Sequence, residues 1–258
     1  MGVVNVTPDS FSDGGLFGDA AQAIAHARKL IEEGADILDI GGESTRPGSL
    51  PVPLAEERRR VLPVIEGLSG CGVPVAVDTR KPELMGEAIV AGASMVNDTN
   101  ALRAEGALET VAATDAAVCL MHMRGDPGNM QDAPRYDDVV REVREYLLDR
   151  VTAAEGAGIA RHRIVVDPGF GFGKTLEHNL ALLRSLGAFV DVGGALLTGL
   201  SRKSMLGHLA GREVRARVYA SVAAALVAVE KGAHIVRVHD VAATRDALAV
   251  WQAVMRNA

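Results

Sequence analysis

EGADILDIGGESTRPG, residues Glu33 to Gly48, is the stretch from which the fold of this chain can be predicted. A helix ends there at Gly34, and the apolar run Ile37–Ile40 follows before a polar loop. Glycine suits the left-handed residue that often ends a helix, and a short β-branched run predicts a buried strand. The same order returns as AGASMVND (Ala91–Asp98) and as KGAHIVRVHD (Lys231–Asp240). A repeated unit of helix, glycine, strand and polar end predicts a parallel sheet with functional groups along one edge.

Eight units of this kind follow one another along the 258 residues, and no linker or low-complexity segment separates them. The predicted strands are Gly2–Val6, Ile37–Ile40, Val73–Val77, Ala93–Val96, Ala117–Met121, Arg163–Val166, Ala195–Thr198 and His234–Val238. The predicted helices are Asp19–Glu33, Leu54–Leu68, one that opens at Lys81-Pro82, Glu105–Thr114, Asp137–Glu155, Leu176–Leu186, Arg215–Lys231 and Thr244–Val254. A (β/α)8 barrel needs roughly 250 residues, whereas the alternative, a doubly wound open sheet, seldom needs eight units. We therefore predict an α/β protein with a single (β/α)8 TIM barrel domain over residues 1–258.

The composition excludes several classes of protein. Hydrophobic residues make up 48% of the chain and charged residues 23%, which suits one large domain with an ample core. The formal net charge of −6 gives no electrostatic basis for general nucleic-acid binding. No apolar run reaches the roughly 18 residues that a membrane span needs, and the N-terminus lacks the pattern of a signal peptide. Cys71 and Cys119 lack the spacing of a metal site, so we expect free thiols in a cytoplasmic protein.

Polar side chains follow every predicted strand, and the active sites of (β/α)8 barrels are built at these strand ends. In chain order they are Asn5, Asp39 with Thr45-Arg46, Asp78, Asn97-Asp98, His122, Asp167, Ser201-Arg202-Lys203, and Arg237 with His239. Cations and amides belong to the first, second, seventh and eighth units, and carboxylates and carboxamides to the third, fourth and sixth. Because the first and eighth units are neighbours in a closed barrel, we expect a phosphate or diphosphate beside the cations. The carboxylates would suit a polar ring that is rich in N–H donors.

Two local patterns are compatible with other chemistry. The sequence DPGFGFGKT (Asp167–Thr175) suggests a phosphate-binding P-loop, but one required glycine would fall at Pro168. We expect its glycines to let the backbone approach a flat ligand. His122 is a candidate metal ligand, yet no partner residue stands at the spacing of a metal motif. A histidine that lines the pocket is the simpler interpretation.

Seven motifs resemble the dihydropteroate synthase family, and in order they cover nearly the whole chain. They are NVTPDSFSDGG (Asn5–Gly15), DIGGESTRPG (Asp39–Gly48), VDTRKPE (Val77–Glu83), LMHMRGDPGNMQ (Leu120–Gln131), DPGFGFGK (Asp167–Lys174), SRKSMLG (Ser201–Gly207) and RVHDV (Arg237–Val241). The resemblance implies an enzyme of folate biosynthesis that joins 6-hydroxymethyl-7,8-dihydropterin diphosphate to 4-aminobenzoate and releases 7,8-dihydropteroate and diphosphate. It also implies a Mg²⁺ requirement, competition by sulfonamides and a homodimer. Relatives carry a segment before the first strand, and we expect that this N-terminal segment is missing here.

The resemblance further implies roles for individual residues. The pterin would contact Asp78, Asn97, Met121, Asp167, Phe172 and Lys203. The diphosphate would contact Asn5, Thr45, Arg46, Arg237 and His239, with Mg²⁺ near Asn5 and Asp13. The 4-aminobenzoate would contact Phe11, Pro47, Lys203 and Ser204. The catalytic groups would be Asp78, Asp167, Lys203, Arg237 and His239, which stabilise a pterin cation and the departing diphosphate.

Two other functions fit part of this pattern. A folate-dependent methyltransferase binds pterins in a similar barrel, but a methyl carrier has no diphosphate for a cation such as Arg46 to hold. A pterin-binding protein without catalytic activity is the alternative from another class. The presence of the implied catalytic and diphosphate-binding residues argues against it, and a measurement of diphosphate release would separate all three functions.

Overall fold

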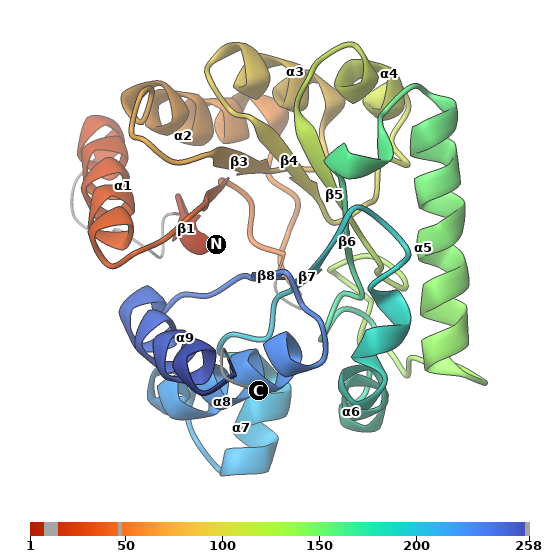
Figure 1. Cartoon of the computed structure of the whole chain (residues 1–258). Helices are drawn as coiled ribbons and strands as arrows, with labels where there is room; N and C mark the ends of the chain where they lie inside the picture. Colours follow the sequence, from red (N-terminus) through yellow and green to blue (C-terminus); the bar gives the residue numbers. More distant parts are fainter. Residues whose placement is uncertain (8–14, 46–47, 256–258) are drawn as a thin grey trace.

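Eight parallel strands form one curled sheet in the order β1 to β8, each hydrogen-bonded to the next strand in sequence. The computed structural model describes residues 1–7, 15–45 and 48–255. The strands are β1 (Gly2–Asn5), β2 (Leu38–Gly41), β3 (Val75–Asp78), β4 (Met95–Asp98), β5 (Ala117–Met121), β6 (Ile164–Asp167), β7 (Ala195–Thr198) and β8 (Ile235–Val236). They lie in the centre of the molecule with the helices around them (Figure 1). The predicted α/β fold with (β/α)8 architecture is confirmed.

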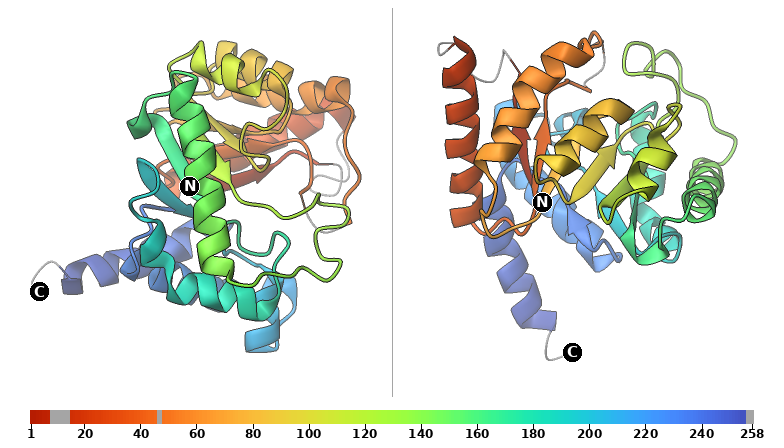
Figure 2. Two further views of the ribbon diagram at one scale, coloured as in Figure 1. Left: turned by 90° about the vertical axis from the view of Figure 1, so that its right-hand side faces the viewer. Right: turned by 90° about the horizontal axis from the view of Figure 1, so that it is seen from above.

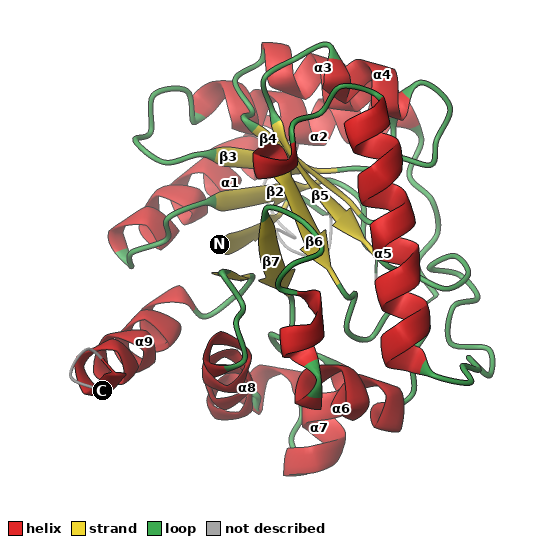
Figure 3. Cartoon of the chain, turned by 45° about the vertical axis from the view of Figure 1, so that its right-hand side comes forward, coloured by secondary structure: helices red, strands yellow, loops and turns green. Residues whose placement is uncertain are grey.

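The helices cover the outside of the strands (Figure 3). They are α1 (Gly15–Glu32), α2 (Leu54–Gly67), α3 (Pro82–Val90), α4 (Ala107–Ala112), α5 (Val139–Gly156), α6 (Leu176–Arg184), α7 (Ser204–Ala210), α8 (Val218–Glu230) and α9 (Val241–Met255). The end of α9 projects from the barrel in both the side view and the view from above (Figure 2). In the described part of the chain, no helix combines the length and the apolarity that a membrane crossing requires.

The first and last strands meet through the N-terminal residues. Val238, which follows β8, forms a parallel bridge with Gly2. The Val3 amide donates to the Val238 carbonyl at 3.0 Å, and the Val238 amide donates to the Met1 carbonyl at 2.9 Å. The first and eighth units are therefore neighbours, as the sequence predicts. Groups that follow β1 and β8 meet at the same edge of the barrel.

Two sets of buried apolar side chains stabilise this arrangement. The larger set lies between the strands and the helices and includes Ile40 and Leu147, both of which are 0% exposed. The smaller set fills the inside of the barrel and consists of Met1, Ala76, Met95, Cys119, Val165 and Leu197. Side chains alternate between the two faces of a strand, so each of the strands β3 to β7 contributes to both sets. The inner set closes the barrel below the polar strand ends.

The structure differs from the predicted elements mainly in the segment after β7. The sequence SRKSMLG was expected to be a loop, but Ser204–Ala210 forms the short helix α7, which ends at Gly211 with a φ of 62°. The strand β8 spans two residues, Ile235–Val236, and is shorter than the predicted His234–Val238. The residues on either side of it still hydrogen-bond to β1 and β7, so the path of the chain is as predicted.

Candidate active site

The buried apolar set inside the barrel, here called the apolar plug, gives way to the functional residues along four strands. Inward-facing positions recur every second residue, so a plug residue on each of these strands has an inward neighbour nearer the strand end. That neighbour is polar on three strands and is Met121 on β5. The pairs are Ala76 and Asp78 on β3, Met95 and Asn97 on β4, Cys119 and Met121 on β5, and Val165 and Asp167 on β6. Four residues of the implied pterin site therefore form one ring above the plug. The strand period brings them together, because they lie far apart in the sequence.

Asp39 lies one layer deeper, opposite Ala76 on the neighbouring strand, and is 0% exposed. Its Oδ2 accepts from Arg237 Nε at 2.5 Å and from Asn97 Nδ2 at 3.1 Å. A second nitrogen of the same guanidinium, Nη2, donates to Asp78 Oδ2 at 2.9 Å. Asp39 thus connects the cation of the eighth unit to the amide of the fourth. The sequence indicated Asp39 as a strand-end residue but assigned it no role.

These contacts shift the protonation of the groups that form them. Burial and the nearby carboxylate of Asp39 raise the pKa of Asp78 to about 7. Burial alone would lower the pKa of Arg237, but Asp39 and Asp78 together raise it above its ordinary value. The sequence predicted cations and carboxylates on separate sides of the mouth. The structure instead pairs the central cation with two carboxylates, which neutralises much of its charge.

Asp167 occupies the end of β6 beside the loop of residues 168–173, here called loop 6. Its Oδ1 accepts from the Gly169 amide at 2.8 Å, while burial raises the pKa of the carboxyl group. Across the loop, the Lys203 ammonium lies 3.9 Å from the centre of the Phe172 ring. Burial lowers the pKa of Lys203 to about 8. Phe172 belongs to one apolar cluster with Met121, so a carboxylate, a cation and two apolar side chains gather beside loop 6.

Arg202 and His239, two further predicted residues of the cationic group, are engaged by neighbours on their own side of the barrel. Arg202, which has a φ of 58°, donates to both carboxylate oxygens of Asp240, at 3.0 and 2.5 Å. His239 Nδ1 lies 3.0 Å from Ser201 Oγ, which also accepts from the His239 amide at 3.1 Å. Asp240 therefore takes up the charge of Arg202, whereas Ser201 orients the imidazole.

The remaining predicted residues fall at the edge of the mouth or outside the described structure. Asn5 ends β1 and lies opposite Gly41, and half-buried Thr45 follows β2. Ser204 is exposed at the first position of α7. Four predicted residues lie outside the residues that the structure describes: Phe11, Asp13, Arg46 and Pro47.

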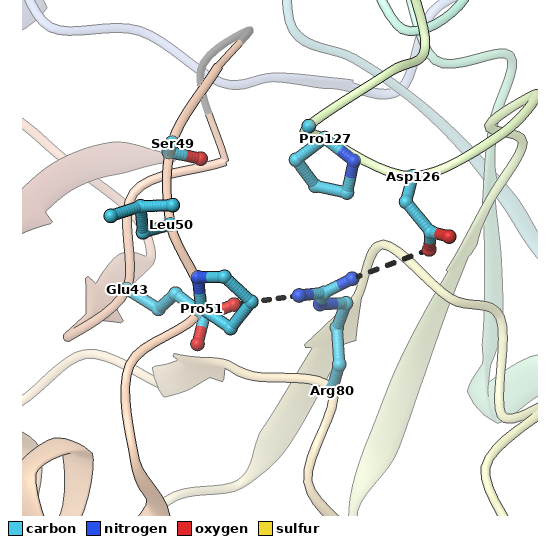
Figure 4. Close-up of a pocket in the computed structure, with 8 residues that line it drawn as sticks. Glu43, Ser49, Leu50, Pro51, Arg80, Asp126 and Pro127 are labelled. Carbon is cyan, nitrogen blue, oxygen red and sulfur yellow. Dashed lines mark hydrogen bonds and ion pairs between the residues drawn. The ribbon is translucent and has the colours of Figure 1, made fainter.

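Glu43, which was not assigned a role from the sequence, holds the start of the loop after β2. It accepts from Arg80 Nη2 and from Lys81 Nζ, both at 2.7 Å, and from the Val52 amide at 2.9 Å. Burial opposes ionisation, but these donors lower the pKa of Glu43 below its ordinary value. Arg80 also approaches Asp126, so a cation between two carboxylates spans a pocket of ≈ 280 Å³ (Figure 4). Three loops of the mouth are thereby connected.

The sequence DPGFGFGK is a tight backbone loop and not a phosphate-binding P-loop. Gly169, Gly171 and Gly173 have φ values of 69°, 80° and 62°, the left-handed region that glycine adopts most readily. His122 accepts from Lys174 Nζ at 2.9 Å, which explains this buried histidine without a metal ion. Among the residues that the structure describes, no group of three or more His, Cys, Asp or Glu side chains is arranged to hold a metal.

An eight-stranded barrel whose mouth combines buried carboxylates with apolar side chains fits the class of pterin-binding enzymes. Residues 1–239 match the family model described as pterin binding enzyme. A dihydropteroate synthase of Neisseria meningitidis serogroup C is 54% identical over 262 residues, covering 100% of this chain and 93% of that protein. The chain belongs to the dihydropteroate synthase family of pterin binding enzymes.

Solved structures agree with this assignment. The dihydropteroate synthase of Xanthomonas albilineans with 4-aminobenzoic acid superposes with a TM-score of 0.94 and is 56% identical, covering 99% of this chain and 92% of that one. A structure of the Xanthomonas enzyme with 7,8-dihydropteroate has a TM-score of 0.90 and 53% identity, with the same coverage. The family predicted from the seven motifs is confirmed.

Proposed function

We propose that this chain is a transferase that condenses 6-hydroxymethyl-7,8-dihydropterin diphosphate with 4-aminobenzoate to give 7,8-dihydropteroate and diphosphate. The observation that supports it best is the mouth of the barrel, where the Lys203 ammonium lies 3.9 Å from the centre of the Phe172 ring and close enough to Asp167 to feel its charge. Arg237 belongs to the same group of charges, because Asp167 contributes to its raised pKa. One substrate could place a flat ring beside Asp167 and Phe172 and an anionic tail beside Arg237.

The slot bordered by Asp78, Asn97, Asp167 and Phe172 would hold the pterin. The pyrimidine edge of a pterin presents a ring N–H beside an exocyclic amine, and one carboxylate can accept from both. Asp167 suits that role because its Oδ1 is already oriented by the Gly169 amide. Met121, with Phe172, would provide the apolar walls, and Lys203 and Asn97 would hydrogen-bond to polar atoms at the edge of the ring.

Arg237 would bind the diphosphate together with Asn5, Thr45, Arg46 and His239. A guanidinium has five N–H donors, and Asp39 and Asp78 use two of them in this structure. The remaining donors are available for phosphate oxygens in bidentate geometry. The two carboxylates fix the plane of the guanidinium, so little conformational entropy is lost when the diphosphate binds.

Magnesium fits the donor set at the start of the chain. The Asn5 carboxamide stands at the barrel edge, and oxygen ligands of this kind, together with substrate phosphates, are what Mg²⁺ prefers. Asn5 and Asp13 would hold the ion. When bound, it neutralises charge on the diphosphate and so makes this group a better leaving group.

The amine would approach from the side of α7. Lys203 and Ser204 begin this helix at the mouth, and Phe11 and Pro47 would complete the 4-aminobenzoate site. A cationic Lys203 would attract the carboxylate of the substrate. A sulfonamide that imitates 4-aminobenzoate would compete at the same place.

The reaction needs no strong general base, because the arylamine is already neutral. The carbon–oxygen bond to the diphosphate breaks, the leaving group keeps the electron pair, and the pterin ring delocalises the positive charge. The amine lone pair then forms the carbon–nitrogen bond, and water takes the released proton. Asp78 and Asp167 would stabilise the cation, while Arg237 and His239 would hold the diphosphate. Lys203 would position the two rings.

Diphosphate release by the purified chain tests this function. With both substrates and Mg²⁺, we expect stoichiometric 7,8-dihydropteroate and diphosphate, and we expect Asp167→Asn and Arg237→Ala to lose most of this activity. The stepwise order predicts some diphosphate release before 4-aminobenzoate is added. Strict dependence on the amine would refute the stepwise order, and a lack of product from the unaltered chain would refute the function.

We also propose a homodimer in the cytoplasm. Leu209 on α7, Val214, and Tyr219 on α8 are 56%, 45% and 88% exposed, which is an unusual group of apolar side chains for a surface left in water. A second copy of the chain would cover them. Free thiols at Cys71 and Cys119 suit a reducing compartment. A sedimentation mass equal to one chain, unchanged by Tyr219→Glu, would argue against the dimer.

A further inference from the structure

Lys174 is a buried cation that none of the roles above uses. It is 3% exposed, and its Nζ donates to the carbonyls of Gly169 at 2.9 Å and Phe172 at 3.0 Å. The same nitrogen lies 2.9 Å from His122 Nδ1 and 3.4 Å from the His122 carbonyl. Among the residues that the structure describes, no carboxylate forms an ion pair with it. Burial lowers the pKa of Lys174 to about 7, while the nearby Asp167 carboxylate favours the charged form. The ammonium form therefore depends on these acceptors, and the arrangement needs an explanation.

A neutral His122 suits a position beside the Lys174 ammonium group. Burial, with Lys174 close by, lowers the pKa of His122 to about 2, so its Nδ1 accepts a hydrogen bond at neutral pH. His122 packs edge-on against the Tyr146 ring, with centroids 4.8 Å apart. In the described residues, the hydrogen-bond partners of the Lys174 nitrogen are therefore all acceptors, as they would be around a bound ammonium ion.

The carbonyl groups of loop 6 face side-chain donors, and the loop packs tightly against the neighbouring segment. A Cβ atom on Gly169 would overlap the His122 carbonyl oxygen, and one on Gly173 would lie 2.5 Å from the Arg124 carbonyl oxygen. The loop backbone thus lies directly against the segment that follows β5. Gln131 Nε2 donates to the Gly171 carbonyl at 2.6 Å, and Tyr136 Oη donates to the Gly173 carbonyl at 2.9 Å. Lys174 provides the donors for the two carbonyls that are most deeply buried.

The same loop fixes three sides of the proposed pterin slot. The Gly169 amide donates to the Asp167 carboxylate, and Phe172 forms an apolar wall. A Cβ atom on Gly171 would lie 3.2 Å from Lys203 Cδ, so the backbone there supports the Lys203 stem. Lys174 binds the carbonyl of Gly169, whose amide binds Asp167, and the carbonyl of Phe172, whose ring contacts Lys203.

We infer that Lys174 is a positioning residue that sets the shape of the pterin slot by acting as a covalently attached cation inside loop 6. This inference rests on the proposed function. It assigns Lys174 no contact with the substrate. Without the ammonium group, the carbonyls of Gly169 and Phe172 lose their donor and turn toward water. Asp167 and Phe172 then lose their fixed positions. The backbone of Lys203 stays in place, because its amide donates to the Leu200 carbonyl and its carbonyl accepts from Arg217 Nη1, so the 4-aminobenzoate side keeps its shape.

Two variants of the full chain test this inference. Lys174→Met keeps an unbranched side chain as far as Cε and removes the ammonium group, and Lys174→Ala leaves space for n-propylammonium, which matches the atoms removed. Because two buried carbonyls lose their donor, we expect KM for the pterin diphosphate to rise about tenfold or more in both variants. We expect KM for 4-aminobenzoate to stay within about twofold. Adding n-propylammonium chloride should restore Lys174→Ala but not Lys174→Met, and tetramethylammonium chloride should restore neither.

A matched control separates positioning from a general loss of stability. Leu147→Ala removes a side chain on α5 that is 0% exposed and belongs to the apolar set between the strands and the helices. It should lower Tm without raising KM for the pterin diphosphate. The inference is overturned if Lys174→Met leaves that KM unchanged, if both KM values rise together, or if the variant cannot fold. If the unaltered chain releases no diphosphate, the proposed function fails instead.

Discussion

The carboxylate of Asp39 provides the most direct test of how the mouth of the barrel is organised. Asp39→Asn keeps the size of the side chain and one acceptor, but removes the negative charge beside Arg237. Losing one partner of a buried ion pair costs roughly 3–5 kcal/mol. Asp78 still binds the guanidinium, which is 22% exposed, so part of that loss is offset. We therefore expect a loss of about 2 kcal/mol in the free energy of unfolding.

The same change should reach catalysis through Arg237. Asp39 fixes the guanidinium at Nε and the Asn97 amide at Nδ2, so both groups lose a partner on the side away from the substrate. If about 2 kcal/mol of this loss appears in the transition state, kcat/KM for the pterin diphosphate falls about 30-fold. Steady-state diphosphate release and urea denaturation measure the two quantities on one preparation.

Asp98→Asn is the matched control. Asp98 is also 0% exposed at a strand end, but its oxygens accept from the Asn100 and Leu102 amides, both at 2.7 Å. This variant should lose stability and keep kcat/KM within about threefold. The reasoning is refuted if the two variants lower kcat/KM equally. It is also refuted if the effects of Asp39→Asn and Arg237→Gln on kcat/KM are additive, since contacting residues should couple.

Two further predictions concern loop 6 and the titration of Asp78. Gly169→Ala should cost about 3 kcal/mol or more, because φ is 69° and the new Cβ would overlap the His122 carbonyl oxygen. The control Gly158→Ala has a φ of 99° with no atom within 4 Å and should cost about 1 kcal/mol by urea denaturation, so equal losses would contradict the packing argument. Because the pKa of Asp78 is raised to about 7, the folded chain holds this proton more tightly than the unfolded chain, and the resulting stabilisation is lost as the pH rises through about 7. The difference in unfolding free energy between the unaltered chain and Asp78→Asn should therefore decrease from pH 4.5 to 8, and a constant difference would contradict this assignment.

Local patterns in the sequence were sufficient for most of the fold. Gly34, Gly92 and Gly232 end helices before strands, and each has a φ between 94° and 117° in the structure. An apolar run flanked by such a glycine can hardly form anything except a buried strand. The helix α7 was missed because its seven residues are too few to show a helical period. Most of its residues also belong to the motif SRKSMLG, which was interpreted for its functional residues and not for its secondary structure.

The polar rim was predictable for the same reason, but the direction of each side chain was not. Asn97 and Asp98 are adjacent, yet Asn97 faces the inside of the barrel and Asp98 binds the amides of the following turn. Only the phase of the strand decides between them, and a register shift of one residue would reverse it. Lys174 showed no signal, because a lysine that ends a glycine-rich loop is usually solvated.

By itself, the sequence determined eight strand–helix units, one closed sheet and a polar mouth, because each of these depends on the order of residues within a few turns of chain. Only the tertiary structure decided which charges meet there. Arg237 and Asp39 are 198 residues apart, and closure of the barrel brings them to 2.5 Å. Lys174 likewise meets His122 across 52 residues. The electrostatic energy of such a pair depends on distance and burial, and neither can be read from local sequence.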